Sequence, residues 1–179
     1  IIVLGGDGTV NEVINGIDCL ANVTLGYIPI GSSNDFARGL GLPADPLKAL
    51  ENILAPVRHL AINIGVLEYG DKRRRFSVST GLGFDAGVCH EVMVSRLKVF
   101  LNKIKLGKLS YAGVALHRMI SLDPKDMTVI MDGTRKLDFH KVYFATAMNL
   151  AYEGGGFKFC PKADCKDDLL DIIVISDMP

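Results

Sequence analysis

The sequence predicts an α/β region followed by a largely antiparallel β domain that carries helical inserts. Three observations predict this fold class. The chain opens on a buried strand, a glycine-rich turn and an amphipathic helix. Strand and helix patterns then alternate over roughly the first 55 residues, and from about residue 60 apolar residues recur with the period of a strand. We therefore expect an α/β domain over residues 1–60 and a β-rich domain over residues 61–179.

The elements of the first region follow from apolar spacing and capping residues. Residues 1–4 are continuously apolar, as in a buried parallel strand. The helix after the glycines has one apolar face, formed by Val10, Val13, Ile14 and Ile17. Residues 24–30 read as a second strand and residues 34–35 suit a helix start. Asp45 before Pro46 is an N-cap and N1 pair that opens a third helix, on which Leu47, Leu50 and Leu54 share a face.

The second region has the alternation of half-buried strands. Residues 60–66 alternate apolar with polar or small side chains, and residues 75–80 read as their hairpin partner across a polar turn at 70–72. Helical segments are expected at about 86–105 and 108–121. A strand ending at Met131 leads into Asp132-Gly133, a hairpin turn signal. Further strands are expected at about 139–149 and 169–176.

Composition excludes several classes of protein. Apolar residues make up 49% and charged residues 22%, which is ordinary globular usage rather than that of a disordered chain. Lys plus Arg equals Asp plus Glu at 20 each, which removes the strongest sequence argument for nucleic-acid binding. No apolar stretch is unbroken enough for a membrane-spanning helix. Four cysteines without CxxC spacing predict reduced thiols rather than a zinc site or a disulfide framework: Cys19, Cys89, Cys160 and Cys165.

The two ends of the chain suggest a segment of a longer protein. The sequence opens on a strand-like run without an initiator methionine and stops just after another strand. Because a single strand cannot satisfy its own backbone groups, we expect partner strands outside this sequence.

The turn Gly5-Gly6-Asp7-Gly8-Thr9 carries the main chemical signal. A glycine-rich turn between a strand and a helix exposes backbone N–H groups and the positive end of the helix dipole, which together bind phosphate. An aspartate within the turn suits a nucleotide bound with Mg²⁺. The alternative is a tight turn in which Asp7 is only a cap. The sequence is neither a Walker A loop nor a GxGxxG fingerprint.

Four segments resemble one family in the family's own order. Residues 5–13, GGDGTVNEV, resemble the nucleotide motif of the diacylglycerol kinase catalytic-domain family. That family includes bacterial lipid kinases, sphingosine kinases and ceramide kinases and is distantly related to NAD kinases. The other matches are residues 31–38 (GSSNDFAR), residues 81–86 (GLGFDA) and a stretch over residues 154–171 that contains GGG, PKAD and DDLLD.

The resemblance implies a two-domain enzyme in which Mg-ATP phosphorylates a lipid hydroxyl within an interdomain cleft. It implies a β-sandwich-like second domain, incomplete here like the first. Asp7 would be catalytic, and the general base would lie beyond Pro179. The ATP-binding residues would be Gly5, Gly6, Asp7, Gly8, Thr9, Asn11 and Ser32, with Ser32 keeping the hydroxyl of the family's usual threonine. Asn34, Asp35 and Asp85 would line the cleft, although helix capping is an alternative for the first two.

The resemblance also implies a structural Mg²⁺ site near the end of the chain. In similar bacterial members the ion is held by one aspartate and main-chain oxygens, which map here to the Asp167 carboxylate and the carbonyls of Asp164 and Leu169. Asp168 stands where the family usually has glycine, and aspartate tolerates the left-handed backbone such a turn needs. The alternative is an acidic surface turn without a metal.

The expected cofactors are ATP and Mg²⁺, and the expected partners are a lipid substrate and, transiently, a membrane surface. We expect a cytoplasmic, peripherally associated protein, with homodimer formation left open and no nucleic-acid partner. An apolar stripe flanked by cations suggests an interfacial helix, with packing on the β domain as the alternative: Leu97, Phe100, Leu101 and Ile104. NAD kinase-like phosphorylation of a soluble acceptor and a non-catalytic nucleotide-binding module are the rival functions. We expect Asp7→Asn to abolish kinase activity with little effect on stability.

Overall fold

The computed structural model describes residues 1–83 and 123–177. Two compact units are present, one formed by Ile1–Thr80 with Ala147–Asp171 and the other by Gly81–Thr146 with Ile172–Pro179. The segment Ala147–Asp171 therefore groups with the N-terminal part of the chain. The domain division expected at residue 60 stays a prediction, and the helices expected between residues 86 and 121 lie outside the described residues.

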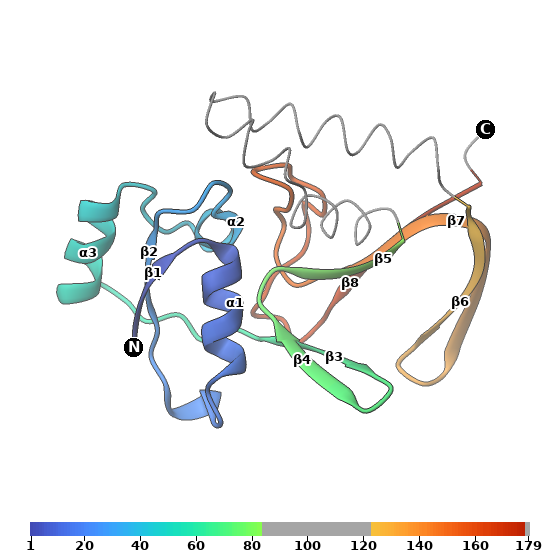
Figure 1. Cartoon of the computed structure of the whole chain (residues 1–179), viewed down its shortest axis with the longest axis horizontal. Coiled ribbons are helices and arrows are strands. Elements are labelled where there is room, and N and C mark those ends of the chain that lie inside the picture. The colour runs from blue at the N-terminus through green and yellow to red at the C-terminus, as the bar shows by residue number, and fades with distance from the viewer. Residues whose placement is uncertain (84–122, 178–179) are drawn as a thin grey trace, which may run out of the picture. The chain divides into compact units, whose positions relative to one another are not determined.

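A parallel strand pair forms the centre of the α/β part, as predicted. β1 (Ile2–Gly5) pairs with β2 (Gly26–Pro29), with Ile2 opposite Gly26 and Gly5 opposite Pro29. α1 (Asp7–Asn15) packs against β1, and α3 (Pro46–Leu54) packs against β2 (Figure 1). A 3-10 turn, η1 (Leu20–Asn22), and the short helix α2 (Asp35–Gly39) complete this part.

The third helix begins where the capping residues predicted but buries a different face. The Asp45 side chain accepts the Lys48 N–H at 2.9 Å, and Pro46 occupies the first turn. Leu47 and Leu54, however, are 71% and 73% exposed. Helix α3 instead packs on β2 through other residues. Ala49 is buried, and the Ile53 side chain lies so close to Gly26 that a Cβ at Gly26 would clash with it. The face shared by the leucines is thus not the one that packs on the sheet.

The core of the first unit joins the N-terminal elements to two later segments. Val10 and Ile14 of α1 pack with Phe36 and Ala37 of α2, and Leu150 and Cys165 complete the same buried cluster. Because these residues come from opposite ends of the sequence, the unit depends on the return of the chain after residue 147.

The strand expected over residues 60–66 begins later than its alternation suggests. β3 (Gly65–Tyr69) pairs with β4 (Lys72–Phe76) in an antiparallel hairpin, and β5 (Ser79–Gly83) is separate. The preceding residues belong to no helix or strand, and Ile62 and Ile64 pack on the core. The Asn63 N–H donates to the Cys165 carbonyl at 2.6 Å rather than to a strand. The alternating burial of this segment therefore belongs to residues that lie outside a sheet.

The second unit contains most of a four-stranded sheet. β7 (Arg135–Met148) pairs with β5, with β6 (Lys125–Met131) and with β8 (Asp171–Ser176). The β6–β7 turn has φ of 51° at Asp132 and 67° at Gly133, which confirms the predicted hairpin turn. None of the helices in the described ranges has the length and apolar character needed to cross a bilayer.

Candidate functional site

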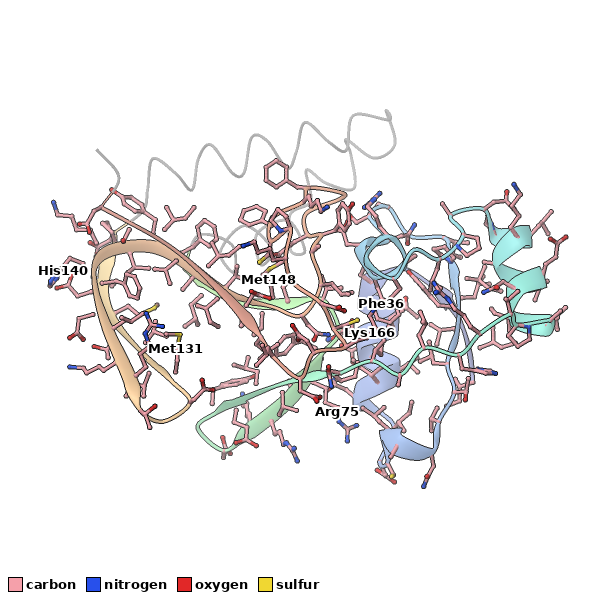
Figure 2. All side chains as sticks on the ribbon, turned by 180° about the vertical axis from the view of Figure 1, so that it is seen from behind. Phe36, Arg75, Met131, His140, Met148 and Lys166 are labelled. Atoms are coloured by element: carbon pink, nitrogen blue, oxygen red, sulfur yellow. The ribbon has the colours of Figure 1, made fainter. Side chains whose placement is uncertain are left out.

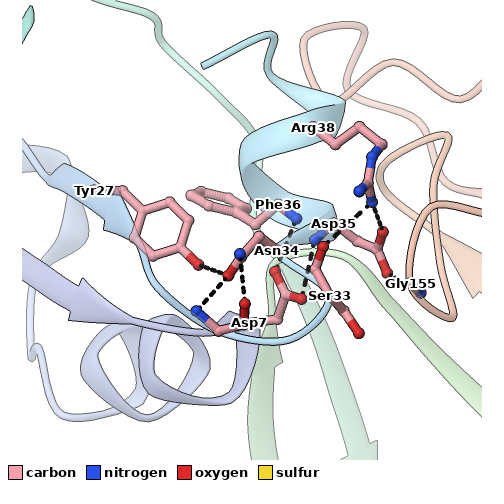
Figure 3. Close-up of polar contacts among 9 residues, drawn as sticks. Asp7, Tyr27, Ser33, Asn34, Asp35, Phe36, Arg38 and Gly155 are labelled. Carbon is pink, nitrogen blue, oxygen red and sulfur yellow. Dashed lines mark hydrogen bonds and ion pairs between the residues drawn. The ribbon is translucent and has the colours of Figure 1, made fainter. Parts of the chain in front are cut away.

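Asp7 joins the glycine-rich turn to the second helix. One carboxylate oxygen accepts the Asp35 N–H at 3.0 Å and the other accepts the Phe36 N–H at 2.9 Å (Figure 3). These N–H groups belong to the first turn of α2, which has no partner for them within the helix. Asp7 is therefore a cap, as the alternative interpretation proposed, but of α2 rather than of the helix that it begins.

Asn34 locks the turn that precedes α2. Its backbone is left-handed, with φ of 54°, and its side chain does not cap the helix. Instead Oδ1 accepts the Gly31 N–H at 2.9 Å while Nδ2 donates to the Gly31 carbonyl at 2.8 Å. The helix-capping alternative is thus wrong for Asn34, because its amide is used within its own turn.

Tyr27 links the same turn to the first strand. Its hydroxyl lies 3.2 Å from both the Gly5 carbonyl oxygen and Asn34 Oδ1. Burial, with a smaller contribution from the charge of Asp7, raises the pKa of Tyr27 to about 12. The hydroxyl therefore stays protonated near neutral pH and remains a donor to the turn.

The two glycine-containing turns approach each other closely. A Cβ on Gly31 would lie 2.4 Å from the Gly6 Cα, so no larger residue fits at Gly31 without moving the chain. Gly8 differs, because a Cβ there would have no heavy atom of residues 1–83 or 123–177 within 4 Å. Packing among the described residues explains glycine at position 31 and does not explain glycine at position 8.

Asp35 ties this cluster to the triglycine segment. It is 3% exposed, and its Oδ2 accepts the Gly155 N–H at 2.7 Å. Its Oδ1 pairs with Arg38 Nη1 at 2.5 Å, and the Arg38 guanidinium also lies 5.9 Å from the centre of the Tyr152 ring. A buried carboxylate thus has both of its oxygens satisfied, by a cation and by a backbone N–H 120 residues away.

Three consecutive glycines make this contact sterically feasible. Gly154, Gly155 and Gly156 have φ of 69°, 87° and 101°. They form the tip of a tight loop closed by two backbone hydrogen bonds between Glu153 and Phe157. L-residues are strained at such φ angles, so glycine at these positions lets the loop place this N–H against Asp35 without strain.

The other predicted nucleotide residues lie on or near the first turns of α1 and α2. Gly8 and Thr9 are exposed on α1, Asn11 is half-buried on the same helix, and Ser32 is exposed before α2. The structure thus gathers Gly5, Gly6, Asp7, Asn34 and Asp35 into one bonded cluster. Asp85 lies outside the described residues. The roles of all these residues in binding or catalysis stay predictions.

The predicted metal turn is bonded to Asn63 instead of to this cluster. Asp168 has φ of 61°, as its replacement of glycine requires. Its N–H donates to Asn63 Oδ1 at 3.1 Å, and its carboxylate accepts from Asn63 Nδ2 at 2.6 Å. Within the turn, Asp167 Oδ1 accepts the Leu169 N–H and the Asp164 carbonyl accepts the Asp167 N–H.

A single-carboxylate site is consistent with this turn. In the described part of the chain, no three His, Cys, Asp or Glu side chains cluster as a metal site would require. The predicted ligands are instead one carboxylate and two backbone carbonyls, all of them the hard oxygen donors that Mg²⁺ prefers. The donor chemistry of Asp164, Asp167 and Leu169 therefore fits the ion.

Sequence reasoning missed residues that organise the cluster and the predicted metal turn. Tyr27 could have been noticed, because a tyrosine within a buried strand needs a partner for its hydroxyl. Arg38 lies within the segment GSSNDFAR, but the sequence alone assigns it no role. Asn63 and Asn149 had no sequence signal: Asn149 Nδ2 donates to the carbonyls of Asn63 and Ser77, a contact visible only once the chain has folded.

Comparison with protein families gives two matches that follow each other along the chain. Residues 1–65 match the family described as diacylglycerol kinase catalytic domain. Residues 77–179 match the family described as YegS C-terminal NAD kinase beta sandwich-like domain, which is more than half of the chain. These matches confirm the predicted fold class of an α/β domain followed by a β-sandwich-like one.

Curated and solved relatives agree with these families. A diacylglycerol kinase of Bacillus subtilis is 34% identical, over 98% of this chain and 54% of its own length. A diacylglycerol kinase of Mycobacterium tuberculosis is 30% identical, over 96% of this chain and 53% of its own. The crystal structure of a diacylglycerol kinase from Bacillus anthracis superposes with a TM-score of 0.67 at 27% identity, covering 98% of this chain and 53% of that one. The chain thus spans about half the length of the relatives that it matches.

Proposed function

The chain belongs to the lipid kinase family that combines a diacylglycerol kinase catalytic domain with a YegS-type C-terminal domain, and on this basis we propose that it contributes the nucleotide site of an ATP-dependent lipid kinase. The reaction moves the γ-phosphoryl group of ATP to a lipid hydroxyl oxygen, and a general base takes the proton of that hydroxyl. A diacylglycerol-like lipid is the proposed acceptor.

Gly8 is the observation that carries the proposal. It lies in the exposed first turn of α1, and a Cβ there would contact none of the residues that the structure describes. Glycine costs about 1 kcal/mol relative to alanine within a helix, so its presence without a packing reason favours a ligand that must approach the backbone. The proposed ligand is phosphate. The first N–H groups of a helix lack partners within it and lie at the positive end of its dipole, so they bind anions.

The bonded cluster would hold this phosphate site in place. Asp7 has both oxygens committed to α2, so we assign it the fixing of the glycine turn relative to α2. Asp35, which is buried and doubly bonded, would fix the triglycine loop beside the same site. Rigid positioning is the larger part of phosphoryl-transfer catalysis, so these roles are compatible with loss of activity on substitution.

Mg²⁺ is proposed as a structural ion at the turn formed by Asp164, Asp167 and Leu169. When bound, it would cross-link the two ends of the turn through the Asp167 carboxylate and the two carbonyls. Because binding to the native state alone raises stability, the melting temperature should rise with Mg²⁺ concentration. Asp167→Ala should remove this dependence, whereas Asp171→Ala, at the first residue of β8, should retain it. An equal Mg²⁺ response of Asp167→Ala and wild type would show that the ion binds elsewhere.

Because the proposed acceptor is a lipid, we propose a cytoplasmic enzyme that associates transiently with a membrane surface. The interfacial helix around Leu97 and Phe100 is part of this proposal and lies outside the described residues.

The experiment is a transfer assay with the full-length protein that carries this sequence. Labelled ATP is offered with diacylglycerol, with a sphingoid base, and with NAD as a soluble acceptor. We expect label in a lipid product and none in NADP. Label in NADP alone would favour the rival NAD kinase-like function, and nucleotide binding without any product would favour a non-catalytic module.

A further inference from the structure

The guanidinium of Arg75 binds one carbonyl in the last turn of α1 and two carbonyls in the segment that follows the helix. Nη1 donates to the Ile14 carbonyl at 2.8 Å and to the Ile17 carbonyl, and Nη2 donates to the Asp18 carbonyl at 3.1 Å. The last carbonyls of a helix lack partners within it and form the negative end of its dipole. Arg75, which is 57 to 61 residues away in sequence, therefore closes α1 with a charge of the favourable sign.

The backbone of Arg75 is bonded to the same helix end. Its N–H donates to Asn15 Oδ1 at 2.8 Å, and its carbonyl accepts from Asn15 Nδ2 at 2.9 Å. Arg75 lies opposite Val66 in the β3–β4 hairpin, so Asn15 occupies the other edge of β4 as a further strand would. We call these hydrogen bonds between Arg75 and the end of α1 the Asn15–Arg75 clamp. Arg75 is labelled in Figure 2.

The clamp fixes one end of a helix whose other end is the proposed phosphate site. α1 runs from Asp7 to Asn15, and a helix of this length is about 13 Å long. Asp7 holds its first turn to α2, so the Asn15–Arg75 clamp is the restraint at the far end. A tilt of about 5° about either end displaces the other by roughly 1 Å, which is enough to lower activity about a hundredfold when a reacting group moves.

The neighbouring cations of the hairpin do not share this arrangement. Arg73 Nε pairs with Glu68 at 3.3 Å within the hairpin, and both side chains are more than two-thirds exposed. Arg74 reaches Glu12 of α1 at 2.8 Å, but through an exposed pair of side chains that contributes little in water. Among the four consecutive basic residues of β4, Arg75 is the one bonded to the backbone of α1.

We propose that Arg75 is a positioning residue for ATP, which acts through α1 on the glycine turn without touching the nucleotide. This inference rests on the proposed function, because it takes the turn at Gly5–Gly8 to be the phosphate site. It assigns to the β3–β4 hairpin the task of orienting the helix that carries that turn.

The test compares Arg75→Ala with Arg73→Ala in the full-length protein, well below the melting temperature of both variants. Arg73→Ala is a matched control, because it removes an arginine from the same strand without touching α1. We expect Arg75→Ala to raise the Kd for Mg-ATP and the KM for ATP by about tenfold. The KM for the lipid should stay within about twofold. Free guanidinium ion should restore ATP affinity to Arg75→Ala and leave Arg73→Ala unchanged. If Arg75→Ala does not fold, Arg75→Lys is scored in the same way.

The outcomes separate this inference from the proposed function. ATP affinity that is unchanged in a folded Arg75 variant overturns the positioning role, even if its melting temperature falls. An equal loss in Arg73→Ala also overturns it, because the effect would then follow charge alone. Wild-type protein that binds no nucleotide overturns the proposed function itself and removes the premise of this inference.

Discussion

Aspartates in two regions of this molecule differ in their burial and in the partners of their carboxylates. In the cluster around α2, Asp7 and Asp35 accept backbone N–H groups from segments 28 and 120 residues away. In the β6–β7 hairpin, Asp138 accepts from Thr128 at 2.5 Å, and Asp126 lies 3.1 Å from His140, within one pair of adjacent strands. Asp35 is 3% exposed, whereas the Asp126 side chain is 70% exposed.

The difference shows where a carboxylate can contribute to the site. When a hydrogen bond of a buried carboxylate is broken, the remaining polar group has no water to bond with, and this is costly. An exposed carboxylate exchanges its partner for water at little cost. Figure 2 shows His140 pointing outward from the hairpin, whereas the bonds of Asp7 and Asp35 in Figure 3 connect three motifs.

The largest effect should follow from removing Asp35. Asp35→Ala leaves the Gly155 N–H and the Arg38 guanidinium without their partner, which should lower the free energy of unfolding by about 3 kcal/mol. Urea denaturation measures this, with Asp138→Ala as the exposed control. Equal losses in the two variants would erase the contrast between the regions.

A smaller loss is expected for Asp7→Asn. One oxygen remains an acceptor, but the new amide group faces an N–H donor, so the cost should be about 1–2 kcal/mol. The sequence alone predicted little effect on stability, and the two bonds to α2 change that expectation. Asp45→Asn is the matched control, since Asp45 also accepts an N–H at a helix start but caps α3. We expect ATP binding to fall in Asp7→Asn and to persist in Asp45→Asn; a loss in both would argue against a local effect.

The smallest effect should come from Asp126→Asn. The hydrogen bond that His140 donates to Asp126 raises the pKa of His140, and the same bond lowers the pKa of Asp126. The pair therefore stabilises the fold between about pH 4 and pH 6.5 and loses this contribution on either side, as Asp126 gains a proton at lower pH or His140 loses one at higher pH. NMR titration of the His140 ring should show its pKa fall in the variant, with less change in stability than for Asp7→Asn. An unmoved His140 titration would exclude the pair.

Local signals predicted local structure well. Asp45-Pro46 gave the start of α3, Asp132-Gly133 gave the hairpin turn, and the residues before Phe36 gave the start of α2. Each depends on residues within a few positions of one another. The strand expected at residues 60–64 failed because the partner of Asn63 is Cys165, about a hundred residues later.

The cluster itself was predictable as a set of motifs and not as a set of contacts. The family resemblance brought Asp7, Asn34, Asp35 and the three glycines to attention. That Asp7 caps α2, or that Asp35 reaches Gly155, depends on the folded arrangement of the unit. Arg75 illustrates the same limit, because a run of four basic residues has the same appearance whether it is solvated or bonded to a helix end.

The central claim, that the turn beginning α1 binds nucleotide phosphate, is tested most directly by Gly8→Ala. The added methyl group meets no atom in the described part of the chain and replaces a helix glycine, so stability should be unchanged or rise by up to about 1 kcal/mol. Gly16→Ala, at the other end of α1, is the control, because its Cβ would make only ordinary contacts at 3.6 Å. Equilibrium binding of Mg-ATP to both variants is the measurement. The account predicts at least about a tenfold loss of affinity for Gly8→Ala alone. Wild-type affinity in a folded Gly8→Ala protein would contradict it.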